Sequence, residues 1–214
     1  METEYTYIGQ LVQRYPQLAA CADDIISAYR MMEASFAAGG KLLVAGNGGS
    51  AADSDHLTGE LLKSFKKKRR PDDSFFAKIE AADKESADYL RGKLEGALPA
   101  IALSNQTALM TASLNDVDGS VVFAQQVHAY GKPEDVFFGI STSGNSKDVI
   151  YAAAVARAQG LKVISLTGRD GGRLKALSDA CIIVPQTETF MIQELHLPVY
   201  HALCLQLEEH FFPV

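Results

Sequence analysis

The chain has 214 residues, of which 47% are hydrophobic and 21% are charged, and its formal net charge is −6. This composition is typical of a globular domain with a sizeable core, and the acidic balance argues against a general nucleic-acid binder. No apolar run approaches the roughly 18 residues of a membrane span, and the acidic opening METEYTYIGQ lacks the layout of a signal peptide. Three widely spaced cysteines in apolar surroundings favour free thiols and a cytoplasmic location: Cys21, Cys181 and Cys204.

Residues 5–38 alternate apolar and polar positions at helical spacing, which predicts helices before the first strand. Pro16 should divide or start a helix, and Gly39 and Gly40 should end one.

Beyond these helices, apolar runs of strand length alternate with helical stretches. The runs are KLLVAG (41–46), LPAIALS (98–104), DVFFGIS (135–141), LKVISLTG (161–168) and ACIIVP (180–185), and the last precedes a helix over about 189–211. This alternation predicts a mostly parallel sheet with helices on both faces. We therefore expect one α/β domain over residues 1–214, a three-layer α-β-α sandwich with five strands and an N-terminal helical extension.

Residues 63–97 contain no strand signal and are expected to form an insertion that is partly helical over 76–94. The segment opens with the basic cluster KSFKKKRR, residues 63–70, followed by the compensating acids of PDDSFFAKIEAADKE. We expect the basic end to be loose and solvated, with anion or partner binding as the alternative.

Two polar loops follow predicted strands, where ligands bind in open α/β sheets. Glycines in AGNGGSAAD, residues 45–53, allow a sharp turn before a helix that should begin near Ser50. The second loop, ISTSGNSKDVI at 140–150, crowds hydroxyl groups at a helix N-terminus, which suits a phosphate monoester. Ordinary helix capping by Ser143 or Ser146 is the alternative. Neither loop has the common nucleotide-binding spacings, so a sugar phosphate is favoured over a nucleotide.

Titratable side chains lie on two predicted helices. His56 and Glu60 are four residues apart and share one helix face, as a metal site, an acid–base pair or an ordinary surface contact would require. The C-terminal helix carries Gln193, His196 and His201 in an otherwise apolar sequence, where a core or interface role is the alternative.

Four segments together resemble the SIS (sugar isomerase) domain: AGNGGSAADSDH, ISTSGNSKDVI, SLTGRDGG and IQELHLPVYH. Within that family, the His-x3-Glu and Gln-x7-His spacings resemble the phosphoheptose isomerases, which interconvert sedoheptulose 7-phosphate and D-glycero-D-manno-heptose 7-phosphate. The resemblance covers the chain except about 63–97. It implies an aldose–ketose isomerase with one zinc ion per active site, and a homotetramer whose active sites lie at subunit interfaces.

The resemblance also implies roles for the matching positions. Substrate contacts are implied for Asn47, Gly48, Gly49, Ser50, Glu60, Asn115, Asp116 and Gln193. Phosphate contacts are implied for Ser141, Thr142, Ser143 and Ser146. Zinc ligands are implied at His56, Glu60, Gln193 and His201, and the acid–base pair is implied to be Glu60 and His201.

The implied reaction moves a proton between C1 and C2 through an enediol. Glu60 is the candidate base that takes the carbon-bound proton, and His201 is the candidate group that transfers protons between the two oxygens. Zinc would polarise the carbonyl. A Glu60 that also bound zinc tightly would have conflicting roles, so its place as base, ligand or both stays open.

The spacing of two implied zinc ligands raises a geometric problem. Gln193 and His201 would lie roughly 12 Å apart along an uninterrupted helix, too far for one ion. Either the helix begins beyond Gln193, or the two residues serve sites in different subunits. Pro198 removes the usual helical partner of the Glu194 carbonyl, so a kink or a late start is expected.

Two departures from the family pattern bear on the substrate. The insertion adds some 25 residues, and Phe190 and Met191 replace an acidic-basic pair common in the family. The rival interpretations are a non-catalytic SIS module (a sugar phosphate sensor or an adaptor like the DnaA initiator-associating protein) and an isomerase of another sugar phosphate.

Overall fold

The computed structural model describes residues 5–213, so the first four residues of the acidic opening and the last residue lie outside it. Its sheet has five strands: β1 (Leu42–Ala45), β2 (Ala100–Ala102), β3 (Val136–Ser141), β4 (Lys162–Thr167) and β5 (Ala180–Ile183). They run in the order β2-β1-β3-β4-β5, and every pair is parallel. Each strand lies within its predicted run, and the predicted mostly parallel sheet is confirmed.

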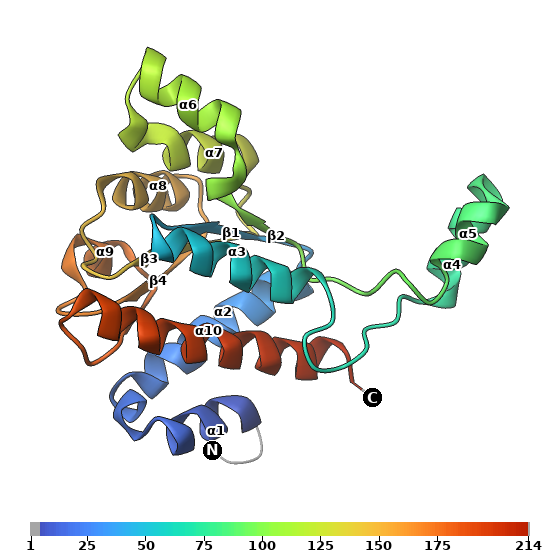
Figure 1. Cartoon of the computed structure of the whole chain (residues 1–214), viewed down its shortest axis with the longest axis horizontal. Coiled ribbons are helices and arrows are strands. Elements are labelled where there is room, and N and C mark those ends of the chain that lie inside the picture. Colours follow the sequence, from blue (N-terminus) through green and yellow to red (C-terminus); the bar gives the residue numbers. More distant parts are fainter. Residues whose placement is uncertain (1–4, 214) are drawn as a thin grey trace.

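Helices cover both faces of this sheet (Figure 1). The helices are α1 (Thr6–Arg14), α2 (Ala22–Ala37), α3 (Gly49–Leu62), α4 (Asp73–Ala82), α5 (Lys84–Leu90), α6 (Thr107–Asp116), α7 (Val122–Tyr130), α8 (Lys147–Ala158), α9 (Gly172–Leu177) and α10 (Thr189–Phe211). Short 3-10 helices are η1 (Pro16–Cys21), η2 (Leu103–Asn105) and η3 (Gly119–Val121). Pro16 begins η1 between two helices, as predicted, because it fixes φ without needing a backbone N–H. Within residues 5–213, none of the helices has the length and apolar character needed to cross a membrane.

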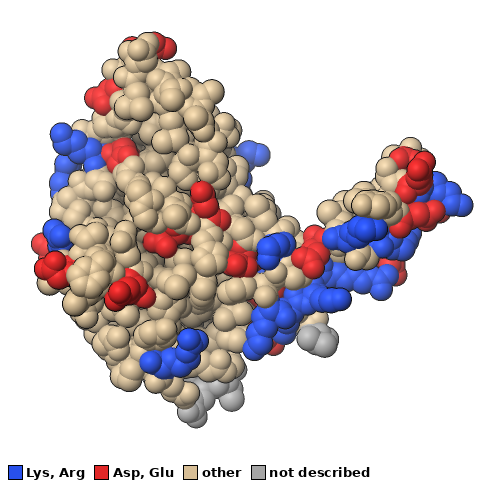
Figure 2. All heavy atoms as spheres, viewed as in Figure 1, with Lys and Arg blue, Asp and Glu red and all other residues tan. Residues whose placement is uncertain are grey.

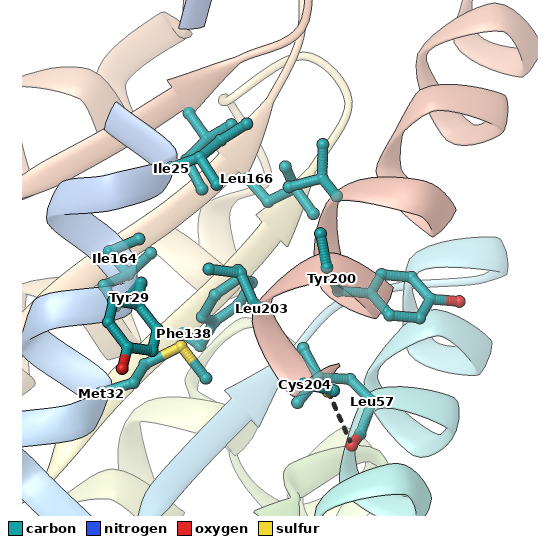
Figure 3. Close-up of a cluster of buried hydrophobic side chains, with 14 of the residues drawn as sticks. Ile25, Tyr29, Met32, Leu57, Phe138, Ile164, Leu166, Tyr200, Leu203 and Cys204 are labelled. Atoms are coloured by element: carbon teal, nitrogen blue, oxygen red, sulfur yellow. Dashed lines mark hydrogen bonds between the residues drawn. The ribbon is translucent and has the colours of Figure 1, made fainter. Parts of the chain in front are cut away.

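Alternate strand residues bury their side chains on opposite faces of the sheet. Phe138 belongs to the core formed with α1, α2, α3 and α10, whereas Phe137 belongs to the core formed with α7, α8 and α9. Figure 3 shows the first core, where Leu203 of α10 lies near Phe138 and Cys204 of α10 lies beside Leu57 of α3. Both faces are buried, which explains why the strands read as continuous apolar runs. This packing holds α3 against α10.

The predicted insertion contains a pair of short helices, α4 and α5, that stands away from the body at the right of Figure 1. They bury Phe76 and Ala87 between them, while Phe75 and Tyr89 are exposed. We call residues 71–97 the arm, and Figure 2 shows Lys and Arg side chains gathered where it joins the body. The expected partly helical character is therefore borne out by α4 and α5.

The expectation of a loose, solvated basic end is wrong at Arg69. Its side chain is 1% exposed and pairs with Glu208 of α10, with 2.8 Å between Nε and Oε1. Neighbouring Lys66, Lys68 and Arg70 are exposed, as expected. Charge patterning could not reveal that one of six basic residues turns inward, because its acidic partner lies on a helix distant in sequence.

Candidate active site

The strand order places two polar loops next to each other. β1 lies between β2 and β3, so the chain leaves β1 and β3 towards opposite faces at this point of the sheet, where open α/β folds bind ligands. The Asn47 side-chain amide donates to both carboxylate oxygens of Asp148, at 3.0 and 2.9 Å. The predicted juxtaposition of the two loops is therefore present.

Glycines shape the loop after β1. Gly48 has φ of 56°, and a Cβ on Gly46 would lie 2.5 Å from the Ser50 carbonyl oxygen. Helix α3 begins at Gly49, one residue before the predicted start. A Cβ on Gly49 would clash with the Gln193 amide nitrogen, so Gln193 lies directly against this loop.

Four hydroxyl-bearing residues surround the turn between β3 and α8: Ser141, Thr142, Ser143 and Ser146. Ser146 is the N-cap residue of α8 but makes no side-chain capping hydrogen bond. Its Oγ lies 2.9 Å from Ser141 Oγ instead. Gly144 has φ of 64°, and a Cβ there would clash with the Gly171 carbonyl. The turn thus leaves hydroxyl groups beside the N-terminus of a 12-residue helix, the arrangement that suits a phosphate group.

A second cluster forms where α3 packs against α10. His56 Nε2 lies 3.1 Å from Glu60 Oε1, and the rings of His56 and His201 are 4.9 Å apart, edge to face. Two buried atoms of the cluster have no hydrogen-bond partner: Glu60 Oε2 and His201 Nε2. His201 therefore joins the pair of His56 and Glu60 that the sequence predicted. The unpaired Glu60 Oε2 and His201 Nε2 are available to a proton, a substrate or a metal ion.

Tyr200 and Asp53 form a hydrogen-bonded chain on the Nδ1 side of His56. Tyr200 Oη lies 3.0 Å from His56 Nδ1 and 3.3 Å from Asp53 Oδ1. Burial and the nearby Asp53 raise the pKa of Tyr200, so it keeps its proton as a donor. When Tyr200 donates to Asp53 and accepts from His56 Nδ1, His56 Nε2 carries a lone pair that faces the Glu60 carboxylate. Two facing acceptors require a proton or a cation between them.

Gln193 and His201 do not converge on one point. Helix α10 begins at Thr189 and continues to Phe211, so the alternative of a helix start beyond Gln193 is wrong. Gln193 lies at the start of α3, whereas His201 lies beside His56 and Glu60. Within residues 5–213, no group of three or more His, Cys, Asp or Glu side chains is arranged as a complete metal site.

The chain is similar to proteins of one named family. The SIS domain family model matches residues 90–168. The chain is 43% identical over 172 residues to the phosphoheptose isomerase of Helicobacter pylori strain P12, spanning 80% of this chain and 76% of that relative. It is 39% identical over 193 residues to the phosphoheptose isomerase of Rhodospirillum rubrum, spanning 90% and 89%. The chain belongs to the phosphoheptose isomerase family. A solved phosphoheptose isomerase from Francisella tularensis is 32% identical, with a TM-score of 0.75 over 95% of both chains.

Two predicted residues of this phosphoheptose isomerase family member make no hydrogen bond to either cluster in the described part of the chain. Asn115 and Asp116 end α6, are exposed, and hydrogen-bond to each other at 2.7 Å. Leu114 and Val117 beside them are 68% and 76% exposed. Among the described residues, no hydrogen bond joins Asn115 or Asp116 to the other predicted site residues. The two residues therefore hydrogen-bond to each other rather than to the site, although the following turn η3 packs against α8.

His201 also lines a cavity of about 170 Å³ between α1 and α10. Arg14, Tyr7 and Glu194 line the same cavity. Burial lowers the pKa of His201, and the positive charges of His56 and Arg14 lower it further, against the opposing effect of Glu60. The imidazole is therefore favoured in its neutral form, which can both accept and donate a proton near neutral pH.

Sequence reasoning missed Asp53, Tyr200 and Arg14. Asp53 precedes His56 by three residues on α3, a helical spacing that could have flagged it. Tyr200 and Arg14 carried no local signal, because only the packing of α10 on α3 and α1 brings them close to the two histidines.

Proposed function

We propose that the chain is a phosphoheptose isomerase that converts sedoheptulose 7-phosphate to D-glycero-D-manno-heptose 7-phosphate, a step in heptose biosynthesis. The observation that carries this proposal is the cluster of His56, Glu60 and His201, with unsatisfied buried atoms on Glu60 and His201. The curated relatives and the solved structures with this family name support it. A non-catalytic sensor or adaptor would need no such carboxylate and imidazole.

Each cluster has its part in the proposed reaction. The hydroxyl-rich turn of residues 141–146 and the loop of residues 47–50 hold the phosphate and the sugar. Glu60 takes a proton from C1 of the open-chain ketose and returns one to C2. His201 transfers a proton from the C1 oxygen to the C2 oxygen, so that the ketose becomes an aldose through an enediol.

The two imidazoles and the carboxylate of the cluster are side chains of the types that bind zinc. In the tautomer with the proton on His56 Nδ1, His56 Nε2 and Glu60 Oε1 face each other as two acceptors, and His201 Nε2 is buried without a hydrogen-bond partner. We expect these three residues to hold zinc. Gln193 would join them as a ligand only if it served the site of another subunit or if α10 moved. When bound, the ion would supply a Lewis acid at the sugar carbonyl. Glu60 must then bind it loosely enough to keep an oxygen free for the carbon-bound proton.

A homotetramer with active sites between subunits is part of the proposal. The exposed Asn115 and Asp116, with apolar Leu114 and Val117 around them, support it, because a partner subunit could bring this helix end to the sugar. We expect the assembly to work in the cytoplasm, with no nucleic-acid or membrane partner.

The test is direct conversion. The zinc-loaded protein is incubated with sedoheptulose 7-phosphate, and the aldose product is followed by NMR beside parallel reactions with pentose and hexose phosphates. We expect turnover of the heptose phosphate. Conversion of a shorter sugar alone would assign the chain to another aldose–ketose isomerisation, and inertness towards every sugar would favour the adaptor.

A further inference from the structure

Glu208 near the end of α10 is a buried carboxylate with an unusually complete set of donors. Its side chain is 1% exposed. The backbone N–H groups of Phe65, Lys66 and Lys67 donate to its two oxygens at 2.9 to 3.0 Å, and Arg69 Nε donates at 2.8 Å. Burial opposes ionisation, but these donors outweigh it and hold the pKa of Glu208 below its ordinary value. Glu208 is therefore a charged anchor for the turn that follows α3.

Arg69 uses its guanidinium to join this anchor to the end of α3. Nη2 donates to the Glu60 carbonyl oxygen at 2.8 Å, and Nη1 donates to the Leu61 carbonyl oxygen at 2.7 Å. Carbonyl groups in the last turn of a helix have no partner within the helix, so a fixed cation there restrains that turn. The restrained turn is the one that carries the Glu60 side chain.

The same anchor also reaches His201. Phe65, whose N–H binds Glu208, places its ring 5.2 Å from the His201 ring, edge to face. Glu208 and His201 lie on one helix, seven residues apart, and so on nearly the same face. The polar contacts around Glu208 thus fix the backbone of Glu60 and one wall of the His201 ring at once. We call Glu208, Arg69 and residues 65–67 the latch.

A buried ion pair is weak evidence for stability, because the cost of removing two charges from water can exceed their attraction. The latch also closes the base of the arm, since Gly96 N–H donates to the Arg69 carbonyl oxygen at 2.6 Å. Closing the arm would need only these backbone contacts. Two further contacts indicate instead a role at the two catalytic candidates. The Arg69 guanidinium binds the carbonyl oxygens of Glu60 and Leu61, and the Phe65 ring contacts His201.

We propose that Arg69 and Glu208 are positioning residues. They fix Glu60 on α3 and His201 on α10 in position relative to each other. This inference rests on the proposed isomerase function. Displacement of a reacting group by about 1 Å can cost 100-fold in rate, so a restraint of this kind affects turnover more than sugar phosphate binding.

The chain supplies a matched control in Asp135. This carboxylate is 2% exposed, pairs with Lys41, and accepts the backbone N–H groups of Lys41 and Lys132 at 2.9 and 2.8 Å. It lies before β3, at the amino end of the sheet and away from the site. Asp135→Asn therefore removes a similar buried charge without touching the latch.

The experiment compares Glu208→Gln, Arg69→Lys and Asp135→Asn in the full-length, zinc-loaded protein. We expect Glu208→Gln and Arg69→Lys to lower kcat at least 10-fold with KM within about twofold, and Asp135→Asn to lower Tm with kcat within twofold. Arg69→Lys keeps the charge but loses the three-way donor geometry. Arg69→Lys should therefore retain more of the Tm of the unaltered protein than of its kcat.

A readout without turnover separates this inference from the proposed function. The His201 ring signals, assigned by comparison with His201→Asn, should shift in the NMR spectra of Glu208→Gln and Arg69→Lys but not of Asp135→Asn. Shifted signals in a protein inert towards sugars would support the latch and refute the isomerase. Unchanged signals, or kcat losses no larger than those of Asp135→Asn, would overturn the latch. If Glu208→Gln does not fold, Arg69→Lys decides alone.

Discussion

The imidazole rings of His56 and His201 lie 4.9 Å apart, edge to face, although they come from helices far apart in the sequence. Glu60 is 3.1 Å from His56, and its second carboxylate oxygen is buried without a hydrogen-bond partner. This contact between α3 and α10 brings the candidate base and the candidate proton shuttle into one place. Its chemistry can be tested residue by residue.

Glu60→Gln should lower kcat at least 100-fold, because the amide cannot accept the carbon-bound proton and loss of a general base usually costs about 10² to 10⁴ in rate. Sugar phosphate should still bind, since the phosphate turn is untouched. Steady-state kinetics together with calorimetric binding of sedoheptulose 7-phosphate measure both effects. Turnover near that of the unaltered protein would remove Glu60 from the mechanism.

Ser146→Ala should raise KM for the phosphorylated sugar roughly 5- to 30-fold, the effect of losing about 1–2 kcal/mol of hydrogen bonding. Ser146 makes no side-chain capping bond, so the loss of stability should be limited to its bond with Ser141, about 1 kcal/mol or less. An unchanged KM with a loss of stability would instead assign Ser146 a structural role only. Ser27→Ala, which removes an exposed hydroxyl bonded to the Asp23 carbonyl oxygen, is the control.

Zinc binding should depend on His56. His56→Ala is expected to weaken zinc binding at least 10-fold, measured by competition with a chromogenic chelator, because it removes a ligand and the facing partner of Glu60. His128→Ala removes an exposed histidine on α7 and should leave affinity unchanged. Chelator treatment should abolish isomerisation, and added zinc should restore it. Equal zinc affinity in both variants would contradict the assignment.

His196 should make the folded protein sensitive to mild acid. Its side chain is fully buried and neither ring nitrogen makes a hydrogen bond of ordinary geometry, and burial outweighs the opposing effect of the Thr167 backbone and lowers its pKa from 6.5 to about 4. Between these values the unfolded chain binds a proton that the folded chain does not, so stability falls as pH drops from 6.5 towards 4, by about 3 kcal/mol in total.

His196→Leu should remove this part of the pH dependence. Urea unfolding of both proteins between pH 4 and pH 7 measures the difference, which should be largest at the acidic end and small at pH 7. Parallel pH profiles for the two proteins would show that His196 does not carry the effect.

Local sequence patterns determined most of the architecture. The runs around β1 to β5 are apolar because both faces of a parallel sheet are covered, and the helix predicted over about 189–211 is observed at Thr189–Phe211. The glycines of the first loop and the hydroxyl groups of the second also predicted two turns, which the structure places side by side. These features depend on neighbouring residues, and neighbours are what a sequence displays.

The tertiary structure alone decided which polar residues meet. The burial of Arg69 depends on Glu208, and the contact of Tyr200 with His56 depends on how α10 lies across α3. Helix α7 was not predicted, although Asp118 caps the 3-10 turn η3 that leads directly into it. Hydrogen bonds and ring contacts act over a few ångströms in space. Contacts between residues far apart in the chain are therefore visible only once the packing of the helices is known.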